Sequence, residues 1–124
     1  MKSPYVATVY AYEVLDDLPV ISSEYVDGDD LHVGTSTLDF ASRAAVARYL
    51  LEGIKAIHDH GLVHRDIKPE NIRLGPKQHP KIVDFGHARG VNSDSVGPYG
   101  NLDGTVQYMS PERLSGDAIA PTDD

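Results

Sequence analysis

The chain has 124 residues, 40% of them hydrophobic, so it has room for one small domain. Its formal net charge of −8, with 11 Lys and Arg residues, argues against nucleic acid or an anionic membrane as its principal partner. Without cysteine, a leader-like apolar start or any apolar run of about 18 residues, it is expected to be a cytoplasmic protein that has no disulfide, thiolate metal site or membrane segment.

Residues 5–26 predict a β-hairpin. Residues 5–14 are rich in β-branched and aromatic types, and residues 20–26 read as a second strand. The sequence LDDLP at residues 15–19 is a turn signal between them, and DGDD at 27–30 ends the pattern. On its own, this pattern is typical of an ordinary edge hairpin.

A long helix is predicted after Ser42. Its apolar residues recur at helical spacing and share one face: Val46, Leu50, Ile54 and Ile57. Ser42 is the N-cap candidate beside this pattern, with residues 35–37 as earlier candidates, and Gly61 suits the C′ position. His58 and His60 do not share a helix face, which favours solvated polar residues over metal ligands.

The sequence HRDIKPEN at residues 64–71 predicts a short polar loop between apolar segments. Asp66 is suited to accept a proton, and Lys68 to neutralise phosphate charge. Asn71 offers an amide oxygen to Mg²⁺. A proton acceptor, a cation suited to phosphate and an oxygen suited to Mg²⁺ therefore lie within six positions of the chain.

Two short strands are predicted after this loop, at residues 71–74 and 81–83, across a turn that contains Gly and Pro. Asp84-Phe85-Gly86 follows directly. An acid at a strand end beside a glycine is a natural metal position. Residues 87–104 contain four glycines and predict a mobile segment, which GTVQYMSPE at 104–112 closes.

In this order and spacing, the motifs at 64–71, 84–86 and 104–112 resemble those of eukaryotic-type (Hanks-type) Ser/Thr protein kinases. The resemblance covers roughly residues 5–116 and implies an α+β, protein-kinase-like fold that is truncated. Residues 1–124 are expected to form a partial kinase domain. Residues 1–26 hold N-lobe strands and the start of the hinge, and 27–124 a partial C-lobe with the catalytic loop and the activation segment.

The resemblance implies transfer of the γ-phosphoryl group of ATP to a Ser or Thr hydroxyl of a protein substrate, with ATP and Mg²⁺ as cofactors. Asp66 is expected to orient the hydroxyl and accept its proton, and Lys68 to stabilise the γ-phosphate. Thr105 is expected to hydrogen-bond both. Asn71 and Asp84 are expected to hold two Mg²⁺ ions.

The resemblance also assigns nucleotide contacts. The carbonyl of Glu24 and the amide of Val26 are expected to bind the adenine edge, with Ser23 as gatekeeper and Asp30 near the ribose. Arg73 stands where the family usually has an aliphatic residue under the adenine ring. Two alternatives follow: its stem covers the ring while the guanidinium reaches water, or its charge impairs nucleotide binding.

Regulation is expected to follow the family pattern, in which Arg65 pairs with a phosphate on the activation loop. Ser93, Ser95 and Tyr99 are candidate acceptors, ahead of Thr105. Asp124 is expected to support the backbone of the catalytic loop.

No G-x-G-x-x-G loop and no V-A-I-K-like strand occur before Tyr5. Residues 1–124 alone are therefore expected to be nearly inactive and to aggregate, unless a missing N-lobe or a partner chain covers the exposed apolar surface. The alternative function is a non-catalytic kinase-like binding or scaffold module. The intact set at residues 66, 68, 71 and 84 favours the enzyme.

Overall fold

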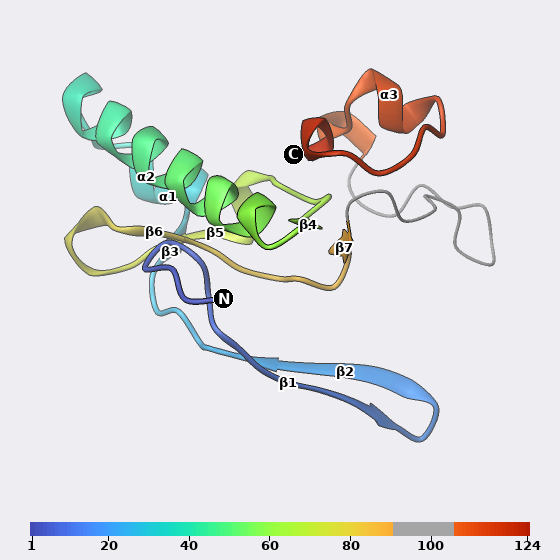
Figure 1. Ribbon diagram of the computed structural model, residues 1–124. Helices are drawn as coiled ribbons and strands as arrows, with labels where there is room; N and C mark the ends of the chain where they lie inside the picture. The colour runs from blue at the N-terminus through green and yellow to red at the C-terminus, as the bar shows by residue number, and fades with distance from the viewer. Residues whose placement is uncertain (91–105) are drawn as a thin grey trace.

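The computed structural model describes residues 1–90 and 106–124. It has the predicted α+β composition, with a long helix against a small sheet and a hairpin that extends away from both (Figure 1). The strands are β1 (Val9–Leu15), β2 (Leu18–Ser23), β3 (Asp29–Asp30), β4 (Leu62–Val63), β5 (Ile72–Leu74), β6 (Pro80–Ile82) and β7 (Arg89–Gly90). The α-helices are α1 (Leu31–Thr35), α2 (Phe40–Asp59) and α3 (Pro111–Leu114). Short 3₁₀ turns cover 69–71, 76–78, 106–108 and 121–123.

The predicted hairpin is confirmed as β1 and β2, which pair antiparallel, but its second strand covers Leu18–Ser23 rather than residues 20–26. Its two-residue turn is Asp16-Asp17, with φ of 50° and 64°, the left-handed conformation that such a tight turn needs. Both strands expose large apolar side chains: Tyr10, Tyr12, Val14, Leu15 and Leu18. Because the hairpin extends away from the other elements, these side chains gain little from burial (Figure 1).

The strand predicted at residues 5–14 begins later in the structure, at Val9, because residues 5–7 belong to a different pairing. Val6 forms a parallel bridge with Ile82. The N–H of Ala7 donates to the Ile82 carbonyl, and the N–H of Ile82 donates to the Tyr5 carbonyl, each at 2.9 Å. This short segment fixes the base of the hairpin to β6.

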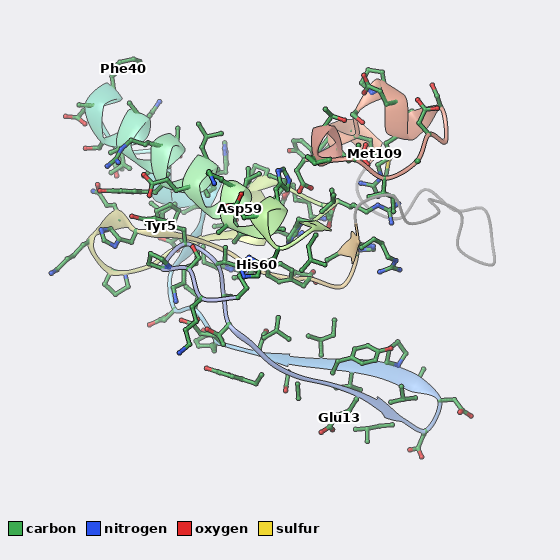
Figure 2. All side chains as sticks on the ribbon, viewed as in Figure 1. Tyr5, Glu13, Phe40, Asp59, His60 and Met109 are labelled. Atoms are coloured by element: carbon green, nitrogen blue, oxygen red, sulfur yellow. The ribbon has the colours of Figure 1, made fainter. Side chains whose placement is uncertain are left out.

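The core lies between α2 and a three-stranded antiparallel sheet of order β3-β5-β6. Val6, Ile57 and Ile82 form its buried centre. Burying side chains of this size stabilises a fold by roughly 1.5–3 kcal/mol each. Tyr5, labelled in Figure 2, extends the contact by stacking on Tyr49 of α2, with 4.9 Å between ring centroids.

The predicted long helix is confirmed as α2, but its N-cap is Asp39 rather than Ser42 or a residue of 35–37. The Asp39 carboxylate accepts the N–H of Ser42 at 2.8 Å, and Asp39 is extended, with φ −71° and ψ 171°. At the other end His60 is the C-cap, and Gly61 follows with φ of 69°. Gly61 therefore occupies the predicted C′ position.

The segment after residue 106 returns to the polar loop between β4 and β5. Ile119 is buried, and the 3₁₀ turn at 121–123 contacts β4. Figure 1 shows α3 beside the C-terminus. Among the described residues, no helix has both the length and the apolar character needed to cross a membrane.

Candidate active site

Three polar side chains meet in the loop at residues 64–71. The Asn71 side-chain amide donates to both the carbonyl and a carboxylate oxygen of Asp66, at 2.9 Å each. The Lys68 ammonium lies 3.1 Å from the same carboxylate oxygen. Asp66 is 6% exposed, so its charge is compensated by close donors rather than by bulk water. The predicted proton acceptor, cation and amide therefore form one cluster.

His64 connects this cluster to Val83, the residue between β6 and Asp84. Its Nδ1 accepts the N–H of Asp66 at 3.3 Å, and its Nε2 donates to the Val83 carbonyl at 3.0 Å. Both contacts require a neutral ring that carries its proton on Nε2. Burial lowers the pKa of His64, which favours the same neutral form. The Phe85 ring meets the imidazole edge-on, with 5.0 Å between centroids.

The two predicted magnesium ligands lie on adjoining backbone segments. The N–H of Val83 donates to the Asn71 carbonyl at 2.9 Å, and Asp84 follows with φ of 63°. One carboxylate oxygen of Asp84 accepts the N–H of Gly86 at 3.1 Å. Within the described residues, the other Asp84 oxygen and the Asn71 amide oxygen make no hydrogen bond.

These two oxygens fit Mg²⁺, a hard cation that prefers a few protein oxygens plus water and substrate phosphate. The part of the chain that the structure describes has no group of three His, Cys, Asp or Glu residues able to hold a metal. A Mg²⁺ ion at the Asn71 and Asp84 pair would need phosphate and water to complete its coordination, because two protein oxygens are too few for its six ligands.

The predicted hinge lines a cavity of about 240 Å³, together with Arg73 of β5 and residues that flank β3 and β6. The lining residues are Glu24, Tyr25, Val26, Gly28, Arg73 and Val83. In the described chain, neither the Glu24 carbonyl nor the Val26 N–H takes part in a hydrogen bond. These are the two groups that the sequence assigns to the adenine edge.

Contacts that the sequence did not predict hold the predicted hinge at Glu24 in place. The Glu24 carboxylate pairs with Lys81 of β6 and accepts the N–H of Thr8 at 3.1 Å. The N–H of Glu24 donates to the Thr8 carbonyl at 2.7 Å. The hydrogen bond from Lys81 lowers the pKa of Glu24. Since Lys81 is 57 positions from Glu24, no local pattern could indicate the contact.

Arg73 and Asp30 are direct partners across β5 and β3, and Lys81 is opposite Arg73 on β6. Direct antiparallel partners project to the same face of a sheet. Arg73 is half-buried and, among the described residues, makes no hydrogen bond or ion pair. Asp30, predicted near the ribose, caps α1 by accepting the N–H of Val33 at 2.9 Å.

Gly28 belongs to the same cavity and also went unrecognised in the sequence. Its φ is 152°, and a Cβ at this position would lie 2.0 Å from the Leu74 carbonyl oxygen. Only glycine permits the chain after the hinge to pass this close to β5. The DG pair at 27–28 was predicted only to end a strand.

Asp124 supports the polar loop, as the sequence analysis expected. Its carboxylate accepts the N–H of Arg65 at 2.6 Å and of His64 at 2.9 Å. His58 also contacts Asp124, at 2.8 Å, so the expectation that His58 is merely a solvated residue is wrong. Thr105 and the acceptors Ser93, Ser95 and Tyr99 lie outside the described residues.

Comparison with known proteins gives a consistent family. The model of the protein kinase domain matches residues 1–124. A probable serine/threonine-protein kinase, PkwA, of Thermomonospora curvata is 38% identical over 111 residues, which are 87% of this chain and 15% of that protein. The serine/threonine-protein kinase PknD of Mycobacterium tuberculosis is 30% identical over 122 residues, 96% of this chain and 18% of PknD.

The probable serine/threonine-protein kinase pknA2 of Bifidobacterium longum is 34% identical over 117 residues, 92% of this chain and 16% of that protein. The chain thus spans 15% to 18% of the length of these three relatives. It belongs to the protein kinase domain family and has part of the α+β kinase fold.

Proposed function

We propose that this chain carries the phosphoryl-transfer residues of a kinase that moves the γ-phosphoryl group of ATP to a Ser or Thr hydroxyl of a protein. The observation that carries the proposal is the cluster of Asp66, Lys68 and Asn71, in which one buried carboxylate is held by an ammonium and an amide. Phosphoryl transfer depends mainly on positioning and charge compensation, and this cluster supplies both.

Asp66 orients the substrate hydroxyl and accepts its proton. Asn71 holds the Asp66 carboxylate through its amide N–H, which leaves the amide oxygen for a metal. The Lys68 ammonium, 3.1 Å from the Asp66 carboxylate, also stabilises the negative charge of the γ-phosphate. Asn71 and Asp84 would hold Mg²⁺, which would neutralise charge on the phosphate oxygens. Thr105 is proposed to hydrogen-bond Asp66 and Lys68.

The nucleotide base binds in the cavity beside the hinge. The Glu24 carbonyl accepts from the adenine amino group, and the Val26 N–H donates to the ring. Of the two alternatives for Arg73, we favour the one in which its stem covers the base, because the side chain is only half-buried and its guanidinium can reach water. Asp30 lies across the sheet from Arg73 and keeps one carboxylate oxygen for the ribose.

The substrate is proposed to be a cytoplasmic protein with a Ser or Thr acceptor. The exposed apolar side chains of β1 and β2 are proposed to be covered by further kinase N-lobe residues or by a partner chain. Nucleic acid is not proposed as a partner, because the net charge is −8.

Calorimetric titration of the purified protein with Mg²⁺-ATP tests this function. Asp84→Asn should abolish the binding heat, because it removes a charged metal ligand. Asp117→Asn is the matched control, since Asp117 is exposed and outside the site. Equal binding by wild type and Asp84→Asn would contradict the metal assignment. Because residues 1–124 alone are expected to be nearly inactive, transfer to a generic Ser/Thr peptide is assayed with a kinase N-lobe supplied. Binding without transfer under that condition would favour the non-catalytic module.

A further inference from the structure

The backbone of Arg65 is in the left-handed region, with φ of 71°. A side-chain-bearing residue holds this conformation only where its surroundings fix it. The N–H of Arg65 is fixed by Asp124, at 2.6 Å. The carbonyl is fixed from the other side, by a guanidinium N–H of Arg113.

The contact between Arg113 and Arg65 acts on the peptide group that precedes Asp66. That group consists of the Arg65 carbonyl, bound by Arg113, and the Asp66 N–H, which donates to His64 Nδ1 at 3.3 Å. With both ends bound, the peptide plane cannot rotate freely. Its orientation sets the direction in which the Asp66 side chain leaves the backbone.

Arg113 is itself held firmly. It is 4% exposed and lies in α3, where its N–H donates to the Ser110 hydroxyl at 3.2 Å. The same hydroxyl donates to Asp123 at 3.1 Å, beside Asp124. The two residues that bind the Arg65 backbone therefore come from one connected segment, residues 110–124.

We infer that Arg113 is a positioning residue that fixes the peptide group between Arg65 and Asp66, and so aims the Asp66 carboxylate. The effect on catalysis rests on the proposed function. The contact between Arg113 and the Arg65 carbonyl does not depend on that function. Asp66 is the residue that touches the substrate, and Arg113 acts only through it.

Amide hydrogen exchange of the whole protein tests the contact without requiring activity. Arg113→Met should speed exchange in residues 64–68 by about tenfold, the effect of one lost hydrogen bond, while exchange in α2 stays unchanged. Arg113→Lys keeps one donor and should restore part of the protection. Arg48→Met is the control, because it removes an exposed arginine of α2.

Unchanged exchange in residues 64–68 of Arg113→Met would overturn the inference, and so would an equal increase throughout the chain. If Arg113→Met does not fold, Ser110→Ala replaces it. This variant keeps the guanidinium but frees the start of α3, and it should raise exchange in the same residues by less.

Steady-state kinetics then tests the positioning role. Arg113→Met should lower kcat by about tenfold and leave KM for ATP unchanged, because the hinge lies elsewhere. Arg113→Lys should recover part of kcat. Inactivity that persists when a kinase N-lobe is supplied, with exchange that responds as expected, would refute the proposed function and keep the contact. An active wild type with unresponsive exchange would refute the contact alone.

Discussion

The N–H of Val83 donates to the carbonyl of Asn71 at 2.9 Å, and this hydrogen bond joins the end of the polar loop to the residue before Asp84. Asn71 and Asp84, the proposed metal-binding acid, are 13 positions apart in sequence, yet the residue that precedes Asp84 is hydrogen-bonded to the Asn71 backbone. Asn71 is consequently bound through its carbonyl, through its side-chain amide and through its backbone N–H, which donates to the Lys68 carbonyl at 3.0 Å.

Replacing Asn71 should therefore affect stability and catalysis together. Asn71→Ala removes two hydrogen bonds to buried Asp66 and should lower the free energy of unfolding by about 1–3 kcal/mol. The phosphoryl-transfer rate should fall by about 100-fold or more, because Asp66 loses its orientation. Urea unfolding and a peptide phosphorylation assay measure the two effects.

Asn71→Asp is the informative companion, because it keeps the side-chain size and the oxygen that is proposed to bind the metal. It replaces the donor with a second carboxylate beside Asp66, so it should destabilise the fold at least as much as Asn71→Ala. A fully stable Asn71→Asp protein would mean that Asp66 does not depend on this donor.

Gly28→Ala should distort the wall of the base cavity. The added Cβ would lie 2.0 Å from the Leu74 carbonyl oxygen, so backbone must move, at a cost of about 3 kcal/mol. Gly61→Ala is a matched control, since Gly61 also has positive φ but has no atom within 4 Å of the added Cβ. That control should cost only about 1 kcal/mol. Equal losses of stability in chemical unfolding would contradict the close approach.

Lys81→Met should weaken ATP binding although Lys81 is expected to make no contact with the base. The substitution frees the Glu24 carboxylate from β6 and so loosens the hinge. Arg48→Met serves again as the control that removes an exposed cation. Unchanged ATP affinity in Lys81→Met would show that the hinge is held without this ion pair.

The ion pair between Glu24 and Lys81 predicts that the free energy of unfolding depends on pH in the acid range. Because the pKa of Glu24 is lowered in the folded state from its ordinary value of 4.5, the unfolded state binds more protons in acid. The stabilisation is complete above pH 4.5 and is lost as the pH falls through the lower, folded pKa. Lys81→Met should lose less stability than wild type over that interval, as measured by urea unfolding.

The sequence predicted the elements whose signals are local. The Asp16-Asp17 turn, the apolar face of α2 and the polar loop each depend on neighbours within a few residues, and the structure has all three. The N-cap of α2 was missed because Asp39 and Ser42 are both good capping residues, three positions apart.

Contacts between distant residues could not be predicted in this way. Residues 5–7 continue the β-rich pattern of the hairpin, yet they pair with β6 at Ile82. Lys81 and Arg113 are ordinary charged residues in the sequence, and only the fold brings them to Glu24 and Arg65. Residues that position the candidate site through distant contacts, such as Lys81 and Arg113, are therefore harder to predict than the polar residues of the loop itself.

His64 predicts a second pH dependence, at milder pH. Burial lowers its pKa from the ordinary 6.5, so the unfolded state takes up a proton that the folded state resists. The free energy of unfolding should fall as the pH drops below 6.5, by at most about 1.4 kcal/mol per pH unit for one proton, and level off below the folded pKa.

His64→Asn should flatten this slope, whereas His60→Asn should keep it, because His60 is exposed. Urea unfolding between pH 5 and 8 measures both variants. An unchanged slope in His64→Asn would mean that another group takes up the proton. It would contradict the assignment of a neutral His64 ring that contacts Asp66 and Val83.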